Sequence, residues 1–175
     1  MKNIIIGSNA TALAAAREAA EHSGYKATIV STRLAGEASQ VGKDLAEAAL
    51  ARKKQQHRGE KVCLIAGGET TVTVKGNGKG GRNTELALAF GMAIQGEPGI
   101  TFLSAGTDGT DGPTDAAGAI VTGRMMMDAR KYGLDPLDYL TRNDSYSFFN
   151  SIKGLVITGP TGTNVMDIQL ALLEN

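Results

Sequence analysis

The chain alternates between short, continuous apolar runs and longer stretches in which apolar residues recur every three or four positions. The short runs are typical of β-strands and the longer stretches are typical of α-helices. Strands are expected at residues 3–6, 26–31, 61–66, 69–75, 100–104, 155–158 and 165–173. Helices are expected at residues 10–23, 36–56, 84–95, 123–132, 136–141 and 144–151.

The order of these elements indicates the fold class. Strands and helices alternate up to residue 66, which is the pattern of βαβ units and predicts a parallel sheet covered by helices. Residues 61–66 are apolar throughout, as parallel strands buried on both faces are. We therefore predict an α/β fold with three layers, α/β/α, and a mostly parallel sheet with a few antiparallel edge strands. Residues 155–158 and 165–173 are expected to form two strands around a turn.

Composition excludes several classes of protein. The length of 175 residues suits one compact domain or two small lobes, and the net charge of zero gives no field that would attract nucleic acid or an anionic membrane. No apolar run reaches the roughly 18 residues of a membrane span, and the first residues lack the long apolar stretch of a signal peptide. The single cysteine, Cys63, lies in an apolar run and is expected in the core. A cytoplasmic, reducing location fits this cysteine usage.

The histidine content limits the possible chemistry. The sequence contains only His22 and His57, and neither has a partner motif beside it. A Ser-His-Asp triad or a His/Cys zinc site would need one of them. Any catalysis is therefore expected to use carboxylates, Lys or Arg side chains, hydroxyls and backbone N–H groups.

Four polar, glycine-rich segments follow expected strands, at residues 7–9, 67–83, 106–118 and 159–164. In open α/β sheets, ligands bind beyond the carboxyl ends of the strands, where such loops gather. The sequence therefore predicts a functional site formed by these loops.

The glycine run at residues 76–81 matches the pattern G-x-G-x-x-G, which alone is weak evidence for a dinucleotide loop. Its backbone amides, together with Lys79, Arg82, Asn83 and the start of the next helix, predict a site for an anion. The alternative is a flexible hairpin tip that carries ordinary surface cations.

Three carboxylates, those of Asp108, Asp111 and Asp115, lie close together in the next loop. Phosphoryl transfer uses carboxylates to hold Mg²⁺ or to accept a hydroxyl proton, and Asp108 and Asp111 could serve either purpose. Asp-Gly pairs are also common turn formers, so one or two of these aspartates are expected to be structural.

The other polar loop residues each allow two interpretations. Ser8 and Asn9 either cap the first helix or contact a ligand. Glu69 lies at a strand terminus, directly after Gly67 and Gly68, where its carboxylate could contact a polyol or a metal ion. Asn164 is either a turn residue in its glycine-rich loop or a residue that contacts a ligand.

Four segments, taken together, resemble those of the MOFRL domain, the carboxy-terminal part of class II glycerate kinases. They are GGETTVTVKGNGKGGRN (67–83), SAGTDGTDGPTDAAGAIV (104–121), NDSYSFF (143–149) and TGPTGTNVMD (158–167). The resemblance covers residues 61–175, which are expected to form the MOFRL domain. Residues 1–60 resemble the end of the larger amino-terminal region of the same enzymes, with the order βαβα.

The resemblance implies phosphorylation of D-glycerate by ATP with Mg²⁺ or another divalent cation, giving 2-phosphoglycerate. It also implies a cleft shared with the amino-terminal domain of the same enzyme, which carries a catalytic lysine; a homo-oligomer is compatible with this arrangement. The candidate catalytic residues are Arg82 and Asp108, and the candidate metal ligands are Asp108 and Asp111. The candidate substrate- or phosphate-binding residues are Ser8, Asn9, Glu69, Lys79, Asn83, Asp111, Asp115 and Asn164.

Two other functions stay open. Members of this family are often labelled hydroxypyruvate reductases, and the G-x-G-x-x-G match is the only local support for an oxidoreductase. The third interpretation is a non-catalytic α/β module that binds a sugar acid or a phosphate.

The position of Arg82 gives a structural prediction. Arg82 lies at the start of a helix, and the loop at residues 108–115 follows the neighbouring apolar strand. Both should emerge at the same edge of the sheet and line one cleft. As an exposed cation, Arg82 is expected to contribute under about 1 kcal/mol to folding.

Overall fold

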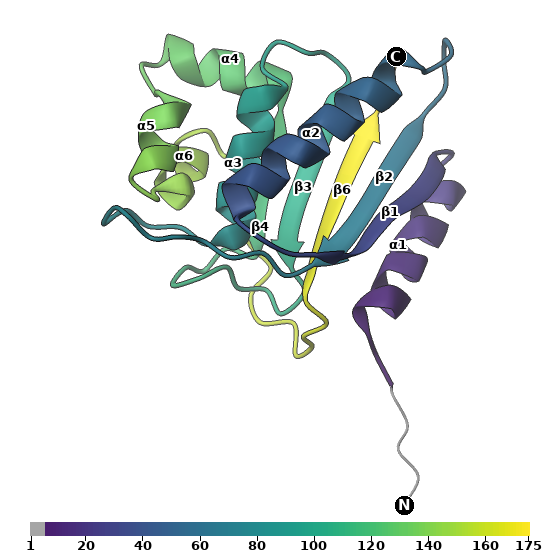
Figure 1. Ribbon diagram of the computed structural model, residues 1–175, viewed down its shortest axis with the longest axis horizontal. Coiled ribbons are helices and arrows are strands. Elements are labelled where there is room, and N and C mark those ends of the chain that lie inside the picture. The colour runs from purple at the N-terminus through teal and green to yellow at the C-terminus, as the bar shows by residue number, and fades with distance from the viewer. Residues whose placement is uncertain (1–5) are drawn as a thin grey trace, which may run out of the picture.

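A mixed six-stranded sheet forms the centre of the computed structural model, which describes residues 6–175 (Figure 1). The strand order is β1-β2-β6-β3-β4-β5. The strands are β1 (Lys26–Leu34), β2 (Val62–Gly68), β3 (Ile100–Gly106), β4 (Gly118–Thr122), β5 (Leu155–Val156) and β6 (Asp167–Leu173). The strand expected at residues 3–6 lies, except for Ile6, outside the described residues.

Helices lie on both faces of the sheet, which confirms the α/β class and the three layers (Figure 1). On one face, α1 (Asn9–His22) packs against β1 and β2, and Leu13 lies with Cys63 and Ile65 in a small apolar cluster. The other helices are α2 (Ala38–Lys54), α3 (Arg82–Ala93), α4 (Gly123–Lys131), α5 (Pro136–Thr141) and α6 (Ser145–Ser151). Within residues 6–175, none of the helices has the length and apolar character needed to cross a bilayer.

The pairing of the strands differs from the expected mostly parallel sheet. Only β1 and β2 pair in parallel, because β6 inserts between β2 and β3 and runs antiparallel to both. Strand β4 forms a further antiparallel pair with β3. No strand was expected from the sequence at these residues, which comprise the end of a loop and the segment after it. The last two expected strands do not pair with each other, since β5 lies at the edge beside β4. Apolar alternation predicts which face a residue occupies, but it does not predict the direction or the neighbour of a strand.

Residues 69–81, called the arm below, do not contain the strand expected at residues 69–75. Their only ladder contact among the described residues is an isolated bridge between Glu37 and Thr71. The arm instead runs in extended form along the lower edge of the molecule, from β2 to α3 (Figure 1). The β-branched residues favour an extended backbone, but the arm bonds to side chains and loops, such as Thr73 to the carboxylate of Glu37.

The packing of α2 against α3 fixes the helix that carries Arg82. At the crossing, Gly42 of α2 lies so close to α3 that a Cβ at this position would overlap the backbone oxygen of Leu86. On its other side, α3 packs on the sheet, where the rings of Phe90 and Phe102 stack with centroids 3.7 Å apart. The start of α3 is therefore held between α2 and the sheet.

We expect Gly42→Ala to lower the free energy of unfolding by up to about 2 kcal/mol. The methyl group forces the helices apart, at a cost of about 1–3 kcal/mol, and the better helix propensity of alanine offsets about 1 kcal/mol of this cost. Urea unfolding followed by circular dichroism measures the change. Lys43→Ala, at an exposed position of the same helix, is the control and should change stability by less than about 0.5 kcal/mol. An increase in stability in Gly42→Ala would show that the methyl group fits between the two helices without overlap.

Candidate functional site

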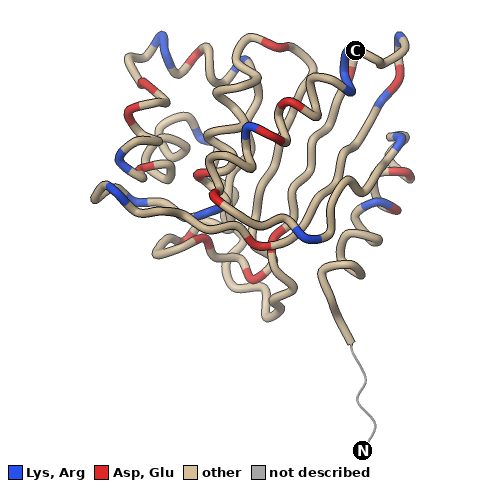
Figure 2. The backbone as a smooth tube through the Cα atoms, viewed as in Figure 1, with Lys and Arg blue, Asp and Glu red and all other residues tan. Residues whose placement is uncertain are grey.

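The loops that follow β2 and β3 and the loop before β6 meet at one edge of the sheet, where several acidic residues lie (Figure 2). An open pocket of about 600 Å³ lies at this edge. Its walls include Glu69, Arg82, Glu85, Asn143 and Pro113, together with parts of the arm. Arg82 and the loop between β3 and β4 thus line one cleft, as the sequence predicted.

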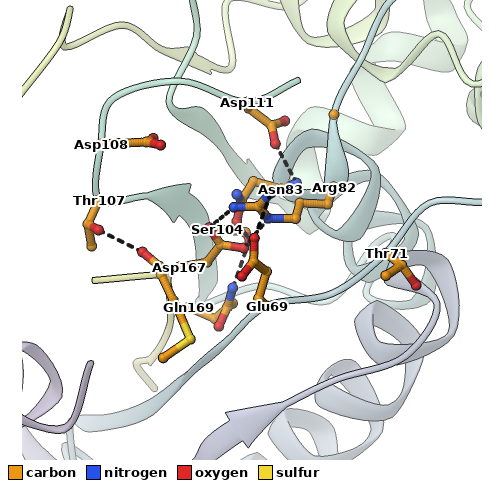
Figure 3. A network of polar contacts seen from close by, with 12 residues as sticks. Glu69, Thr71, Arg82, Asn83, Ser104, Thr107, Asp108, Asp111, Asp167 and Gln169 are labelled. Carbon is orange, nitrogen blue, oxygen red and sulfur yellow. Dashed lines mark hydrogen bonds and ion pairs between the residues drawn. The ribbon is translucent and has the colours of Figure 1, made fainter. Parts of the chain in front are cut away.

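Arg82 is held by a carboxylate that the sequence analysis did not select. Its Nε and Nη2 atoms donate to the two oxygens of Asp167 at 2.6 and 2.9 Å, a bidentate pair (Figure 3). Asp167, the first residue of β6, is only 1% exposed. The hydrogen bond to Asp167 is the main reason that the pKa of Arg82 is raised, so the guanidinium stays charged.

This pair overturns the expectation that Arg82 contributes little to folding. Without Arg82, the buried carboxylate of Asp167 would lose its only ion-pair partner among the described residues. Removing one partner of a buried pair costs about 3–5 kcal/mol, because an uncompensated charge is left behind. Arg82 is therefore both a residue of the pocket wall and a structural residue.

The outer side of Arg82 has a weaker partner. Its Nη1 atom lies 3.2 Å from Oε1 of Glu69, whose side chain is 55% exposed. Ion pairs that are open to solvent contribute about 0–1 kcal/mol. An anion that enters the pocket can therefore replace Glu69 at Arg82 at little cost.

The amino terminus of α3, predicted as an anion site, is occupied by the carboxylate of Asp111. One oxygen of Asp111 accepts from the backbone N–H of Asn83 at 2.9 Å, and the other accepts from the N–H and the hydroxyl of Thr84, each at 2.8 Å. Asp111 is 1% exposed. Burial raises the pKa of Asp111, and these hydrogen bonds oppose the shift. Because both oxygens are engaged, Asp111 caps the helix, and the expected role as a metal ligand does not fit these contacts.

The glycine run is packed rather than flexible. A Cβ on Gly76 would overlap the backbone of Arg142, and a Cβ on Gly80 would overlap the hydroxyl of Ser145, so glycine allows the arm to lie against the α5–α6 region. Lys79 does not face the pocket in this arrangement. Its ammonium group lies 4.1 Å from the ring centroid of Tyr146, whose hydroxyl donates to the exposed Asp115 at 2.7 Å. Neither Lys79 nor Asp115 is among the residues that line the pocket.

Asp108 and Asn164 lie together beyond the ends of β3 and β6. Oδ1 of Asp108 accepts from the N–H and the hydroxyl of Thr110, and Oδ2 accepts from Nδ2 of Asn164 at 3.2 Å. Asp108 is half-buried and lies on the same side of the sheet edge as Arg82 (Figure 3). Among residues 6–175, no group of three or more His, Cys, Asp and Glu side chains is arranged to hold a metal ion.

Ser8 and Asn9 lie at the start of α1. The hydroxyl of Ser8 accepts from the N–H of Thr11 at 3.2 Å, which makes it a helix cap. The buried Asn9 donates through Nδ2 to the backbone oxygens of Val165 and Asp167. Asn9 therefore fixes the loop that leads into β6, and through it the position of Asp167.

A buried polar chain lies behind Arg82 and includes residues that the sequence analysis missed. Ser104 donates to Oδ1 of Asn83 at 2.6 Å and accepts from Gln169 at 3.3 Å (Figure 3). Asn83, expected to bind substrate, is buried and does not line the pocket; its Oδ1 accepts from Ser104, and its Nδ2 has no partner among the described residues. The alternation in the last strand was a usable signal, because it places Asp167 and Gln169 on the same face as the buried Leu173.

Comparison with known proteins places this arrangement in a family. The sequence profile of the MOFRL family matches residues 62–167. D-glycerate 2-kinase of Thermotoga maritima is 47% identical over 159 residues, which are 90% of this chain and 38% of that protein. Glycerate kinase of Mus musculus is 40% identical over 216 residues, covering 98% of this chain and 41% of that protein.

Solved structures agree with this assignment. The crystal structure of glycerate kinase from Thermotoga maritima superposes with a TM-score of 0.95 at 44% identity, covering 98% of this chain and 42% of that one. A protein of Pyrococcus horikoshii superposes with a TM-score of 0.93 at 39% identity, covering 100% of this chain and 40% of that one. The chain thus spans about two-fifths of the length of the relatives it matches.

We expect Asp111→Ala to destabilise the protein by about 2–4 kcal/mol. The substitution removes three hydrogen bonds to a charged group and leaves buried N–H donors at the start of α3 without partners. Thermal unfolding measures the loss. Asp115→Ala, in the same loop but with an exposed carboxylate, is the matched control and should cost under about 1 kcal/mol. Equal effects of the two substitutions would contradict the capping role of Asp111.

Proposed function

Because this chain belongs to the MOFRL family, we propose that it forms the carboxy-terminal part of an ATP-dependent glycerate kinase. The reaction converts D-glycerate to 2-phosphoglycerate, and the pocket beside Arg82 is one wall of an active site shared with an amino-terminal domain. In this proposal residues 61–175 are the MOFRL domain and residues 1–60 are the end of the amino-terminal region. The names of the similar proteins, glycerate kinase and D-glycerate 2-kinase, support it.

The observation that carries the proposal is the presentation of Arg82. A guanidinium fixed by the buried Asp167, with one side open to a pocket, is suited to bind an anionic group of the reactants. Such a preorganised charge also stabilises charge that develops during phosphoryl transfer.

Asp108 is the second reactive group in the proposal. It is half-buried, and Asn164 orients one of its oxygens. Asp108 accepts the proton of the attacking hydroxyl, and Glu69 provides a further acceptor at the pocket wall. Thr70 and the backbone of Gly81 complete the polar part of the wall.

ATP supplies the phosphoryl group, and a divalent cation such as Mg²⁺ neutralises phosphate charge. Mg²⁺ is commonly bound through one or two carboxylates together with substrate phosphates. Asp108 fits that requirement because one of its oxygens has only an amide partner, whereas Asp111 does not fit. The further positive charge that a triphosphate needs is expected from the amino-terminal domain, because Arg82 is the only cation among the described residues that line the pocket.

An oxidoreductase function loses the one feature that supported it. The G-x-G-x-x-G run lies in the packed arm and does not follow a strand, whereas a dinucleotide loop connects a buried strand to a helix.

We expect the 175-residue chain alone to show no glycerate-dependent release of ADP above background. Phosphoryl transfer depends on positioning, and the loss of one side of the cleft removes many orders of magnitude in rate. A coupled ADP assay, repeated with an amino-terminal region supplied from a relative, measures this. Turnover by the chain alone at roughly 1–100 per second would contradict the shared site. Oxidation of NADH in the presence of hydroxypyruvate would instead favour a reductase.

With the amino-terminal region present, we expect Arg82→Ala to lower kcat/KM. The decrease should correspond to a loss of about 2–4 kcal/mol in transition-state stabilisation. Because this substitution also leaves Asp167 unpaired, Arg82→Lys is measured beside it, since lysine keeps the charge and loses the bidentate geometry. Circular dichroism checks folding. Full activity in both variants would remove Arg82 from the mechanism.

A further inference from the structure

Glu85 is a buried carboxylate in the pocket wall that none of the roles above uses. It lies on the first turn of α3, three residues after Arg82, and it is 4% exposed. One oxygen, Oε2, accepts from Nδ2 of Asn143 at 3.0 Å. The other oxygen, Oε1, makes no hydrogen bond to the residues that the structure describes, 6–175, and it is not enclosed from solvent.

Glu85 has few partners for a carboxylate that is buried to this degree. Burial raises the pKa of Glu85, the hydrogen bond from Asn143 lowers it, and the charges of Glu37 and Asp111 raise it further. Buried charged groups normally have several hydrogen-bond partners, and Glu85 has a single amide donor within residues 6–175. Its free oxygen therefore offers an acceptor that a hydroxyl group of a ligand can satisfy.

We propose that Glu85 is the specificity residue of a subsite for a small hydroxy acid. The ligand carboxylate pairs with Arg82, and the hydroxyl that is not phosphorylated, on C3 of D-glycerate, donates to Oε1 of Glu85. This inference rests on the proposed function and assigns the pocket to the acid substrate rather than to the nucleotide.

The spacing of the two residues fits a ligand of this size. Residues three apart on a helix have Cβ atoms about 5–6 Å apart and lie on the same side. A three-carbon acid carries its carboxylate and its terminal hydroxyl within a similar span. The carboxylate replaces the exposed Glu69 on Nη1 of Arg82, while Asp167 keeps the guanidinium in place.

The charges around the pocket favour this ligand over a polyanion. Glu69 and Glu85 line the pocket, Asp111 lies behind it, and Arg82 is the only cation among the described lining residues. A single carboxylate can be paired there, whereas further negative charge would meet these carboxylates. Asn143 is the positioning residue, because its Oδ1 accepts from the N–H groups of Lys75 and Gly76 while its Nδ2 holds Glu85.

The test compares two ligands that differ in one hydroxyl. D-lactate is D-glycerate without the C3 hydroxyl, so the ratio of their dissociation constants isolates the contact with Glu85. Isothermal titration calorimetry with the 175-residue chain measures both constants. We expect the unmodified protein to prefer D-glycerate by about 10- to 100-fold, the range of a hydrogen bond to a charged group.

In Glu85→Leu the preference should fall to less than about threefold, with little change in the affinity for D-lactate. Glu85→Gln keeps the shape of the side chain and a weaker acceptor, so its ratio should lie between those of the unmodified protein and Glu85→Leu. Glu85→Gln replaces Glu85→Leu in the test if circular dichroism shows that Glu85→Leu does not fold. Glu47→Gln is the matched control: it makes the same change at an exposed position that does not line the pocket, and it should leave the ratio unchanged.

Each outcome decides a different point. An unchanged ratio in both Glu85 variants, or an equal loss of affinity for both ligands, would overturn the role of Glu85 and leave the proposed kinase intact. Displacement of D-glycerate by adenosine would assign the pocket to the nucleotide and overturn the inference. No binding of D-glycerate to the unmodified protein would count against this subsite, while turnover with the amino-terminal region would still support the proposed kinase.

Discussion

The ion pair between Arg82 and Asp167 connects the parts of this protein on which the candidate site depends. It joins the first residue of α3 to the first residue of β6, which are 85 positions apart in the sequence. Both nitrogen–oxygen contacts are short, and Asp167 is almost fully buried. Buried charges of this kind are tolerated only when they are paired and hydrogen-bonded. The same contact therefore fixes the edge of the sheet and aims a guanidinium into the pocket.

The site is organised by carboxylates that compensate local positive charge. Asp167 compensates Arg82, and Asp111 takes the place at the start of α3 where a phosphate could otherwise bind. Glu69 covers the remaining side of Arg82 loosely, and Glu85 is left with a free oxygen. The rigid contacts lie below the pocket and the replaceable ones face it, an arrangement suited to binding one small anion.

Much of the fold could be predicted from local patterns. The helical spacing located α2 and α3, the apolar run located β2 with Cys63 in the core, and the glycine-rich segments located the edge at which the loops meet. The prediction that Arg82 and the loop between β3 and β4 share a cleft was confirmed, since Arg82 lines the same pocket as Gly112 and Pro113 of that loop. The strand at residues 69–75 was wrong, because β-branched residues specify an extended backbone and not a partner.

The sequence by itself determined most of the elements, the glycine-rich edge and the family, since each depends on residues close together in the chain or on motifs read in order. Only the tertiary structure decided which polar residues face the pocket. The insertion of β6 between β2 and β3 brought Asp167 to Arg82, and the folding of the loop after β3 placed Asp111 under α3. These pairings join residues 28 and 85 positions apart, and they follow from loop folding and strand order, which no local periodicity encodes.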